Sequence, residues 1–223
     1  MQPATCQSVK TMKVTVEKVL TEIREPSTKA RPKTTSYPPL SKIGLPEFRT
    51  EGHPKLREMW NAAERFAADV NNRTPYWLSF LGTSGTGKTH LAKMLYKHFM
   101  GCSRFNLDYD PKVNKIVGNT GQFCDWRRLT ADLRSGDYGL IEDLTGDWFV
   151  VLDDVGSSYD PNGFVASALD QVLNGRLRKW TVITCNYGLA EIAERMDTRI
   201  ASRMIRDDSI VVECGDVPDY NAR

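Results

Sequence analysis

Residues 82–89 read Gly-Thr-Ser-Gly-Thr-Gly-Lys-Thr and fill every fixed position of the pattern G-x-x-x-x-G-K-[ST]. An apolar run at residues 76–81 precedes this octapeptide, and a helix-forming run follows it at residues 90–96. Glycines let the backbone turn tightly with its N–H groups pointing inward, and a helix N-terminus adds positive charge there. We therefore predict a strand, a phosphate-binding loop and a helix in this order. The alternative is an ordinary turn between a strand and a helix.

The phosphate-binding loop supplies most of the candidate site residues. Lys88 would reach the β- and γ-phosphates of a nucleoside triphosphate, and Thr89 would offer its hydroxyl to Mg²⁺. The expected nucleotide-binding residues are Gly82, Thr83, Ser84, Gly85, Thr86, Gly87, Lys88, Thr89 and His90. The loop predicts a triphosphate with Mg²⁺ as the ligand and leaves the reaction open.

The composition is typical of a protein with one sizeable core. The 223 residues are 40% apolar and 26% charged, and no apolar run approaches the roughly 20 residues that cross a bilayer. The five cysteines are widely spaced and form no C-x-x-C pair, so disulfides and zinc ligation are both disfavoured. We expect reduced thiols, a cytoplasmic location and no membrane partner.

The first 46 residues differ from the rest of the chain. Residues 1–50 hold nine Lys/Arg against four Glu, whereas the whole chain has a net charge of +2. Residues 11–25 have the apolar spacing of a short amphipathic helix, and residues 26–46 carry five prolines, which oppose regular helix or sheet. We predict a basic, Pro-rich arm over residues 1–46 and a globular domain over residues 47–223. The helix could bind a protein partner, or the arm has no function of its own.

Strands and helices are expected to alternate in the globular domain. Apolar runs predict strands over residues 76–81, 122–126, 148–152, 180–185 and 209–213. Helical spacing or composition is found over residues 54–72, 88–99, 127–134, 164–177, 189–196 and 198–205. This alternation predicts an α/β fold with a parallel sheet covered on both faces. Residues 101–121 are less regular; a strand over residues 104–107 is expected, and no role is assigned.

Two acids end one of the predicted strands. The run Phe149-Val150-Val151-Leu152 is followed directly by Asp153 and Asp154. Asp153 would hold Mg²⁺, directly or through water. Asp154 could orient and deprotonate the attacking water. The alternative is a simple Asp-Asp-x-Gly turn, which the upstream phosphate-binding loop makes less attractive.

Polar residues later in the chain complete the candidate site. Asn186 follows the strand at residues 180–185 and could hydrogen-bond the γ-phosphate or the lytic water. Arg199 and Arg203 are four residues apart and would share one face of a short helix. A guanidinium offered to a neighbour's γ-phosphate stabilises transition-state charge; the alternative is a solvated basic helix surface.

The order of these motifs resembles the AAA+ ATPases, and more narrowly their DnaC/IstB-like group of replicative helicase loaders and transposition ATPases. The similarity covers about residues 54–214, and the narrower resemblance depends on Thr184-Cys185-Asn186-Tyr187 and Arg199-Ile200-Ala201-Ser202-Arg203. It implies a P-loop fold of the AAA+ type with a five-stranded parallel sheet, and ATP with Mg²⁺. It also implies self-assembly, in which Arg203, with Arg199 nearby, completes the neighbour's site.

The same resemblance implies an ATPase that binds single-stranded DNA and grips a replicative helicase through its N-terminal segment. Two departures are notable. Asp154 stands where many AAA+ proteins have Glu, which could slow hydrolysis, and no separate C-terminal lid domain is expected. Residues 176–179 could contact DNA phosphates or form a solvated helix end. Tyr159 and Phe164 could stack on bases, although core or loop packing is the favoured role for both.

The leading hypothesis is thus an ATP-dependent helicase loader that acts as a nucleotide-controlled switch. Two alternatives stay open. An IstB-like transposition ATPase on duplex DNA would carry the same motifs, and a nucleotide-binding scaffold without turnover would need only the phosphate-binding loop. The identity of the partner, the oligomer size and the preferred nucleic acid do not follow from the sequence.

Overall fold

The computed structural model describes residues 48–70, 74–101, 108–110, 115–117, 121–206, 208–217 and 219. All of them belong to one compact unit of the chain, residues 34–223. The predicted arm over residues 1–46, its helix and the strand expected at residues 104–107 lie outside the described residues. The helices are α2 (Pro54–Asp69), α3 (Lys88–Gly101), α4 (Trp126–Arg134), α5 (Gly139–Gly146), α6 (Phe164–Gly175), α7 (Leu189–Arg195) and α8 (Thr198–Met204).

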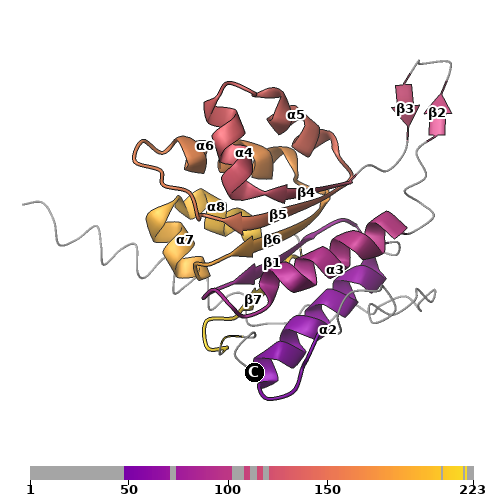
Figure 1. Cartoon of the computed structure of the whole chain (residues 1–223), viewed down its shortest axis with the longest axis vertical. Coiled ribbons are helices and arrows are strands. Elements are labelled where there is room, and N and C mark those ends of the chain that lie inside the picture. Colours follow the sequence, from indigo (N-terminus) through magenta and orange to yellow (C-terminus); the bar gives the residue numbers. More distant parts are fainter. Residues whose placement is uncertain are drawn as a thin grey trace, which may run out of the picture. The chain divides into compact units, whose positions relative to one another are not determined.

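Five parallel strands form the central sheet, as predicted (Figure 1). They are β1 (Trp77–Leu81), β4 (Gly121–Asp125), β5 (Phe149–Val155), β6 (Trp180–Cys185) and β7 (Ile210–Glu213), arranged in the order β4-β5-β6-β1-β7. Because every pairing is parallel, the carboxyl ends of all five strands lie along one edge. The loop after β1 therefore lies beside the ends of β6 and β7, and β6 separates it from β5.

The three inner strands β5, β6 and β1 are buried because helices cover both faces of the sheet, whereas the edge strands β4 and β7 are partly exposed. Side chains from α2 and α3 pack on one face with Leu78 and Phe80 of β1. Helices α4, α5, α6, α7 and α8 pack on the other face with Trp77 and Leu81 of the same strand. Alternate residues of β1 thus enter opposite cores, which is the pleat expected of a strand covered on both sides.

Three elements, one helix and two short strands, were not predicted from the sequence. Residues 139–146 form α5, which was not predicted because glycines at both ends lower its helix propensity. The strand of residues 108–110, β2 (Asp108–Asp110), pairs antiparallel with β3 (Lys115–Val117) and forms a hairpin separate from the main sheet. The other predicted helices and strands of the domain are present, with ends that move by a few residues. In the described part of the chain, no helix is long and apolar enough to cross a membrane.

Candidate nucleotide-binding site

The phosphate-binding loop joins the carboxyl end of β1 to the N-terminus of α3. Gly82, Gly85 and Gly87 have φ values of +112°, +78° and +93°, which side-chain-bearing residues rarely adopt. At Gly82 the reason is also steric, because a Cβ atom would lie 2.6 Å from the backbone nitrogen of Gly215. The glycines of the motif are thus required by the turn itself and by the chain that packs against it.

Lys88 lies inside this turn. Its side-chain nitrogen donates hydrogen bonds to the carbonyl oxygens of Gly82 at 2.8 Å and Thr83 at 2.5 Å, and it lies 3.4 Å from Oγ1 of Thr86. Only 6% of Lys88 is exposed, and this burial lowers its pKa, although nearby thiols and the carboxylates of Asp153 and Asp154 oppose the change. The loop therefore holds a buried cation at its centre, where an anionic ligand would replace the carbonyl contacts.

Thr89 and Asp153 meet across the sheet edge. The Thr89 hydroxyl donates to Oδ1 of Asp153 at 2.9 Å, and the Thr184 hydroxyl donates to the same oxygen at 2.7 Å. Burial raises the pKa of Asp153, and the two hydroxyl donors partly offset this effect. The site thus pairs one carboxylate with one hydroxyl at the point where a cation beside the phosphates would lie.

The donor set suits Mg²⁺. The described residues contain no cluster of three or more His, Cys, Asp or Glu side chains that could enclose a metal ion. Mg²⁺ in nucleotide sites usually takes one or two protein oxygens and completes its shell with water and phosphate oxygens. Thr89 and Asp153 supply two such oxygens, so they fit a metal that arrives with a triphosphate.

Asp154 occupies a β-bulge with unusual backbone geometry. The pairing of β5 with β6 shifts between Leu152 and Val155, and Asp154 has a φ of +58°. Its backbone N–H donates to Oγ1 of Thr184 at 2.8 Å, and its Oδ1 accepts from Nδ2 of Asn186 at 2.6 Å. The bulge turns the second carboxylate toward Asn186, while Asp153 faces Thr89.

Arg127 holds the other side of this carboxylate. Nη2 of Arg127, at the start of α4, lies 3.4 Å from Oδ2 of Asp154. The Arg127 side chain is 69% exposed, so water screens the pair. Asp154 thus has a neutral donor, from the residue after β6, on one oxygen and a solvated cation on the other.

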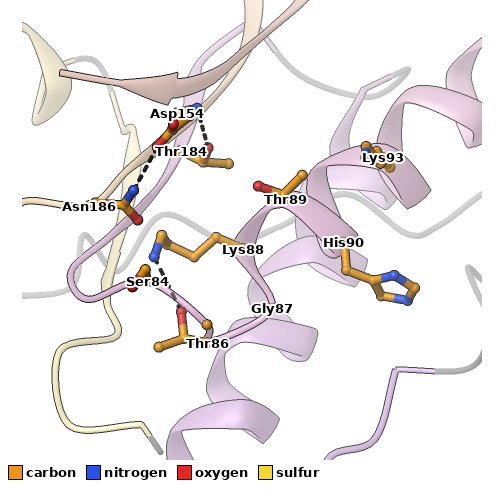
Figure 2. Close-up of a pocket in the computed structure, with 11 residues that line it drawn as sticks. Ser84, Thr86, Gly87, Lys88, Thr89, His90, Lys93, Asp154, Thr184 and Asn186 are labelled. Carbon is orange, nitrogen blue, oxygen red and sulfur yellow. Dashed lines mark hydrogen bonds between the residues drawn. The ribbon is translucent and has the colours of Figure 1, made fainter. Parts of the chain in front are cut away.

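Most of these groups face one open cavity of about 480 Å³. Asp153 and Arg127 do not line it, and Asp153 reaches its edge through Thr89 and Thr184. Figure 2 shows Asp154, Thr184 and Asn186 opposite Lys88 and Thr89. The cavity is lined by Ser84, Gly85, Thr86, Gly87, Lys88, Thr89, His90, Lys93, Asp154, Thr184 and Asn186. Its size is within the range of small-molecule sites.

His90 lies at the rim of this cavity. Lys88 and His90 leave α3 in opposite directions, and the imidazole stacks against Phe48 with ring centroids 6.1 Å apart (Figure 2). His90 therefore lies beside the phosphate-binding loop, with its ring directed away from Lys88.

Arg199 and Arg203 lie elsewhere. Neither lines the cavity. Arg203 instead lines a small cleft with Trp77, at the start of β1, and Ser209, just before β7, which is the amino edge of the sheet. Arg199 is exposed and pairs with Asp197 at 2.8 Å (Nη2 to Oδ2). Within one chain, Arg203 and the phosphate-binding loop occupy opposite edges of the sheet, and Arg199 lines neither the cavity nor the cleft.

The expected DNA contact of Arg176 is wrong. Arg176 is fully buried and donates to the carbonyl oxygens of Leu144, Asp147 and Trp180 at 2.6, 2.9 and 2.7 Å. Burial lowers its pKa to about 10. The guanidinium thus binds backbone carbonyls at the end of α5, just before β5 and at the start of β6, and solvent does not reach it.

The other candidates for DNA contact differ in how exposed they are to solvent. Arg178 is exposed and Lys179 is half-buried, with its ammonium donating to the carbonyl of Thr145. Tyr159 is 82% exposed, whereas Phe164 packs against the core on the α6 face of the sheet. Phe164 is half-buried and therefore has a packing role, and Tyr159 is the more exposed of the two aromatic side chains.

Two residues of the site were not singled out from the sequence, and a third was quoted only as part of a segment. Lys93 lines the cavity one turn after Thr89, and Arg127 contacts Asp154. Thr184, quoted without a role of its own, bridges the two acids. Lys93 could have been found from the i, i+4 spacing on α3. Thr184 and Arg127 belong to other elements, so only the order of the strands brings them to the site.

Comparison with known proteins agrees with this geometry. No protein-family model and no curated protein matches the chain. Among solved structures, the DnaC helicase loader is similar over 73% of this chain and 91% of its own, with 22% identity and a TM-score of 0.55. DnaI is similar over 83% and 90%, with 19% identity and a TM-score of 0.57.

A third similar structure contains a nucleotide. The replication initiator DnaA, bound to AMPPCP and single-stranded DNA, matches 75% of this chain and 47% of its own, with 16% identity and a TM-score of 0.51. The chain therefore has the fold of an AAA+ P-loop domain. The structural resemblance to DnaC-type proteins expected from the sequence is confirmed for the fold, at low sequence identity.

Proposed function

We propose that this chain is an ATP-dependent loader of a replicative DNA helicase, which acts as a nucleotide-controlled switch. The observation that carries the proposal is the 2.9 Å contact between Thr89 and Asp153 beside the buried Lys88. A hydroxyl, a carboxylate and an ammonium then lie together at the edge of the sheet where a phosphate-binding loop begins a helix. This combination supports binding of ATP with Mg²⁺.

Each residue of the cavity would have a separate task in hydrolysis. Lys88 and the loop N–H groups would hold the β- and γ-phosphates, and Thr89 with Asp153 would hold the metal, which neutralises phosphate charge. Asp154 would orient and deprotonate the attacking water. Asn186 donates to the Asp154 carboxylate at 2.6 Å and so fixes its direction. The shorter reach of Asp compared with Glu supports slow turnover.

Self-assembly would complete the site. Arg203 lies at the amino edge of the sheet, too far around the domain to line its own cavity. An arginine that acts on phosphates from there would have to act on a second copy of the chain. If bound ATP brings the copies together in this way, the nucleotide state would control partner binding. The proposed partners are single-stranded DNA and a helicase, and the proposed location is the cytoplasm.

The similarity to a helicase loader and to a replication initiator supports a role in DNA replication. Residues 1–46 are the segment proposed to bind the helicase, because they are basic and rich in proline. A binding assay with the replicative helicase of the same organism, using the full chain and a chain without residues 1–46, tests this assignment. Retained binding without the arm would contradict it.

Turnover on different nucleic acids separates the proposal from its alternatives. Phosphate release from ATP is measured without DNA, with single-stranded DNA and with duplex DNA. The helicase-loader proposal predicts slow hydrolysis that single strands stimulate. Stimulation by duplex alone would favour a transposition ATPase, and ATP binding with no hydrolysis under any condition would favour a scaffold.

A further inference from the structure

Arg203 is held within its own chain by one carboxylate. Its Nη1 donates to Oδ1 of Asp170, which links α8 to α6 on the same face of the sheet. The two side chains are only 15% and 25% exposed, so the pair is far less solvated than the Arg199–Asp197 pair, whose arginine is 71% exposed. A partly buried pair persists in salt, whereas an exposed one is largely screened.

The surroundings of this pair carry excess positive charge. Arg178 and Arg206 line the same small cleft as Arg203, and both are exposed. Among the described residues, Asp170 is the only acid that forms an ion pair with any of these three arginines. Three guanidinium groups with one paired carboxylate leave the cleft attractive to an anion.

We propose that Asp170 is a latch that withholds Arg203 until a second copy of the chain presents its bound triphosphate. Arg203 would then exchange a carboxylate partner for phosphate oxygens, while Arg178 and Arg206 raise the local positive potential. Asp170 is a positioning residue, since it acts only through Arg203. The inference rests on the proposed function, in which Arg203 completes the neighbour's site.

The latch makes assembly compete with an internal ion pair. Each encounter with a second copy must break the Arg203–Asp170 contact, so the free copy is favoured and activity requires more protein. Asn in place of Asp170 keeps the size and the carbonyl acceptor but removes the charge. The Arg203 side chain would then be available to the neighbour's phosphates at lower protein concentration.

The experiment measures ATP turnover per subunit against protein concentration for the full chain. For Asp170→Asn we expect the concentration at half-maximal turnover to fall about threefold to tenfold, which is the scale of coupling between residues in direct contact. Asp170→Glu keeps the charge and should leave this concentration within about twofold of the wild type. Glu142→Gln, on the exposed side of α5, is the matched control, since Glu142 makes no ion pair with a described residue.

Repeating the Asp170 substitution in the Arg203→Ala variant separates the latch from a general effect on folding. With Arg203→Ala present, Asp170→Asn should have no further effect on the concentration dependence, because the latch has nothing to hold. Thermal unfolding confirms that each variant is folded, and Asp170→Ser is the neutral substitute if Asp170→Asn is not. If the protein concentration at half-maximal turnover is unchanged or higher in the neutral variant, the latch is wrong.

The outcome also distinguishes this inference from the function on which it rests. If Arg203→Ala leaves turnover unchanged at every protein concentration, Arg203 does not act on the nucleotide of a second copy, and the latch is wrong as well. If Arg203→Ala lowers turnover but neutral variants at Asp170 behave like the wild type, only the latch is wrong. Equal effects of Asp170→Asn with and without Arg203 would assign Asp170 a structural role.

Discussion

The two edges of the central sheet carry opposite halves of one predicted chemistry. At the carboxyl edge, a buried ammonium, a hydroxyl and the Asp154 carboxylate line a cavity of about 480 Å³, and the Asp153 carboxylate contacts that hydroxyl. The amino edge holds Arg178, Arg203 and Arg206 around a cleft too small for a nucleotide. Motifs that follow one another along the sequence are therefore divided in space. A single copy thus holds the proposed nucleotide-binding groups at one edge and Arg203 at the other, where it cannot reach its own cavity.

The largest expected effect is at the carboxyl edge. Lys88→Ala removes the only lysine of the phosphate-binding loop, so we expect at least about a 100-fold loss in ATP affinity and no measurable turnover. Direct titration with ATP measures the affinity. Lys97→Ala, an exposed lysine of the same helix that does not line the cavity, is the control. Near-normal affinity of Lys88→Ala would remove the basis for the site.

The next effect is at the amino edge and should spare binding. Arg203→Ala leaves the cavity of its own chain intact, so ATP affinity should stay within about twofold of the wild type. Turnover of concentrated protein should fall about 1000-fold, at the lower end of what an arginine acting on phosphates contributes. Dilute wild-type protein should be as slow as the variant. Turnover that does not depend on protein concentration would contradict the division between the edges.

Asp153→Asn should change activity and stability in opposite directions. The amide loses the charge that holds Mg²⁺, so turnover should fall about 100-fold. Without metal, the same change removes a buried charge whose pKa is raised by burial, while its carbonyl still accepts from Thr89 and Thr184. We expect the free energy of unfolding to rise by about 1 kcal/mol at neutral pH, measured by denaturant titration.

The pH dependence of this effect has a definite sign. A raised folded-state pKa means that the folded chain binds a proton at Asp153 where the unfolded chain does not. The destabilisation by the ionised carboxylate is therefore present above the folded-state pKa and is relieved as the pH falls through it. The stability gain of Asp153→Asn should shrink on acidification; a gain that grows as the pH falls would show that another group is responsible.

The smallest expected effect concerns Arg127. Its pair with Asp154 is 3.4 Å long and mostly exposed, so Arg127→Ala should change turnover by only about twofold to threefold. The change should disappear in high salt, which screens the pair in the wild type. Steady-state turnover at two salt concentrations measures this, with Arg128→Ala on the same helix as the control. A loss comparable with that of Arg203→Ala would place an essential arginine at the carboxyl edge.

The sequence predicted best where local chemistry and strand order act together. The phosphate-binding loop, the acids after Leu152 and the strand at residues 180–185 each have a strong local pattern, and the parallel sheet brings their ends to one edge. The contact between Thr89 and Asp153 is the expected consequence. The bulge that turns Asp154 toward Asn186 is not visible in the sequence, because a positive φ at a non-glycine residue depends on its neighbours.

Burial was the harder property to predict. Arg176 and Arg178 are two residues apart in one basic stretch, yet the first is fully buried and the second is exposed. Arg176 is accepted inside the protein because carbonyl oxygens of α5, of Asp147 just after it and of β6 converge on its guanidinium. Likewise, Arg203 carries an ion pair with Asp170, a residue 33 positions earlier, which no local pattern could indicate.

The most direct test of the division between the two edges is a mixing experiment. Lys88→Ala keeps the arginine edge and lacks the nucleotide site, whereas Arg203→Ala keeps the nucleotide site and lacks the arginine. ATP turnover is measured for each folded variant alone and for an equimolar mixture at the same total concentration. We predict that neither variant is active alone and that the mixture recovers a substantial part of the wild-type rate. A mixture as inactive as its components would contradict it.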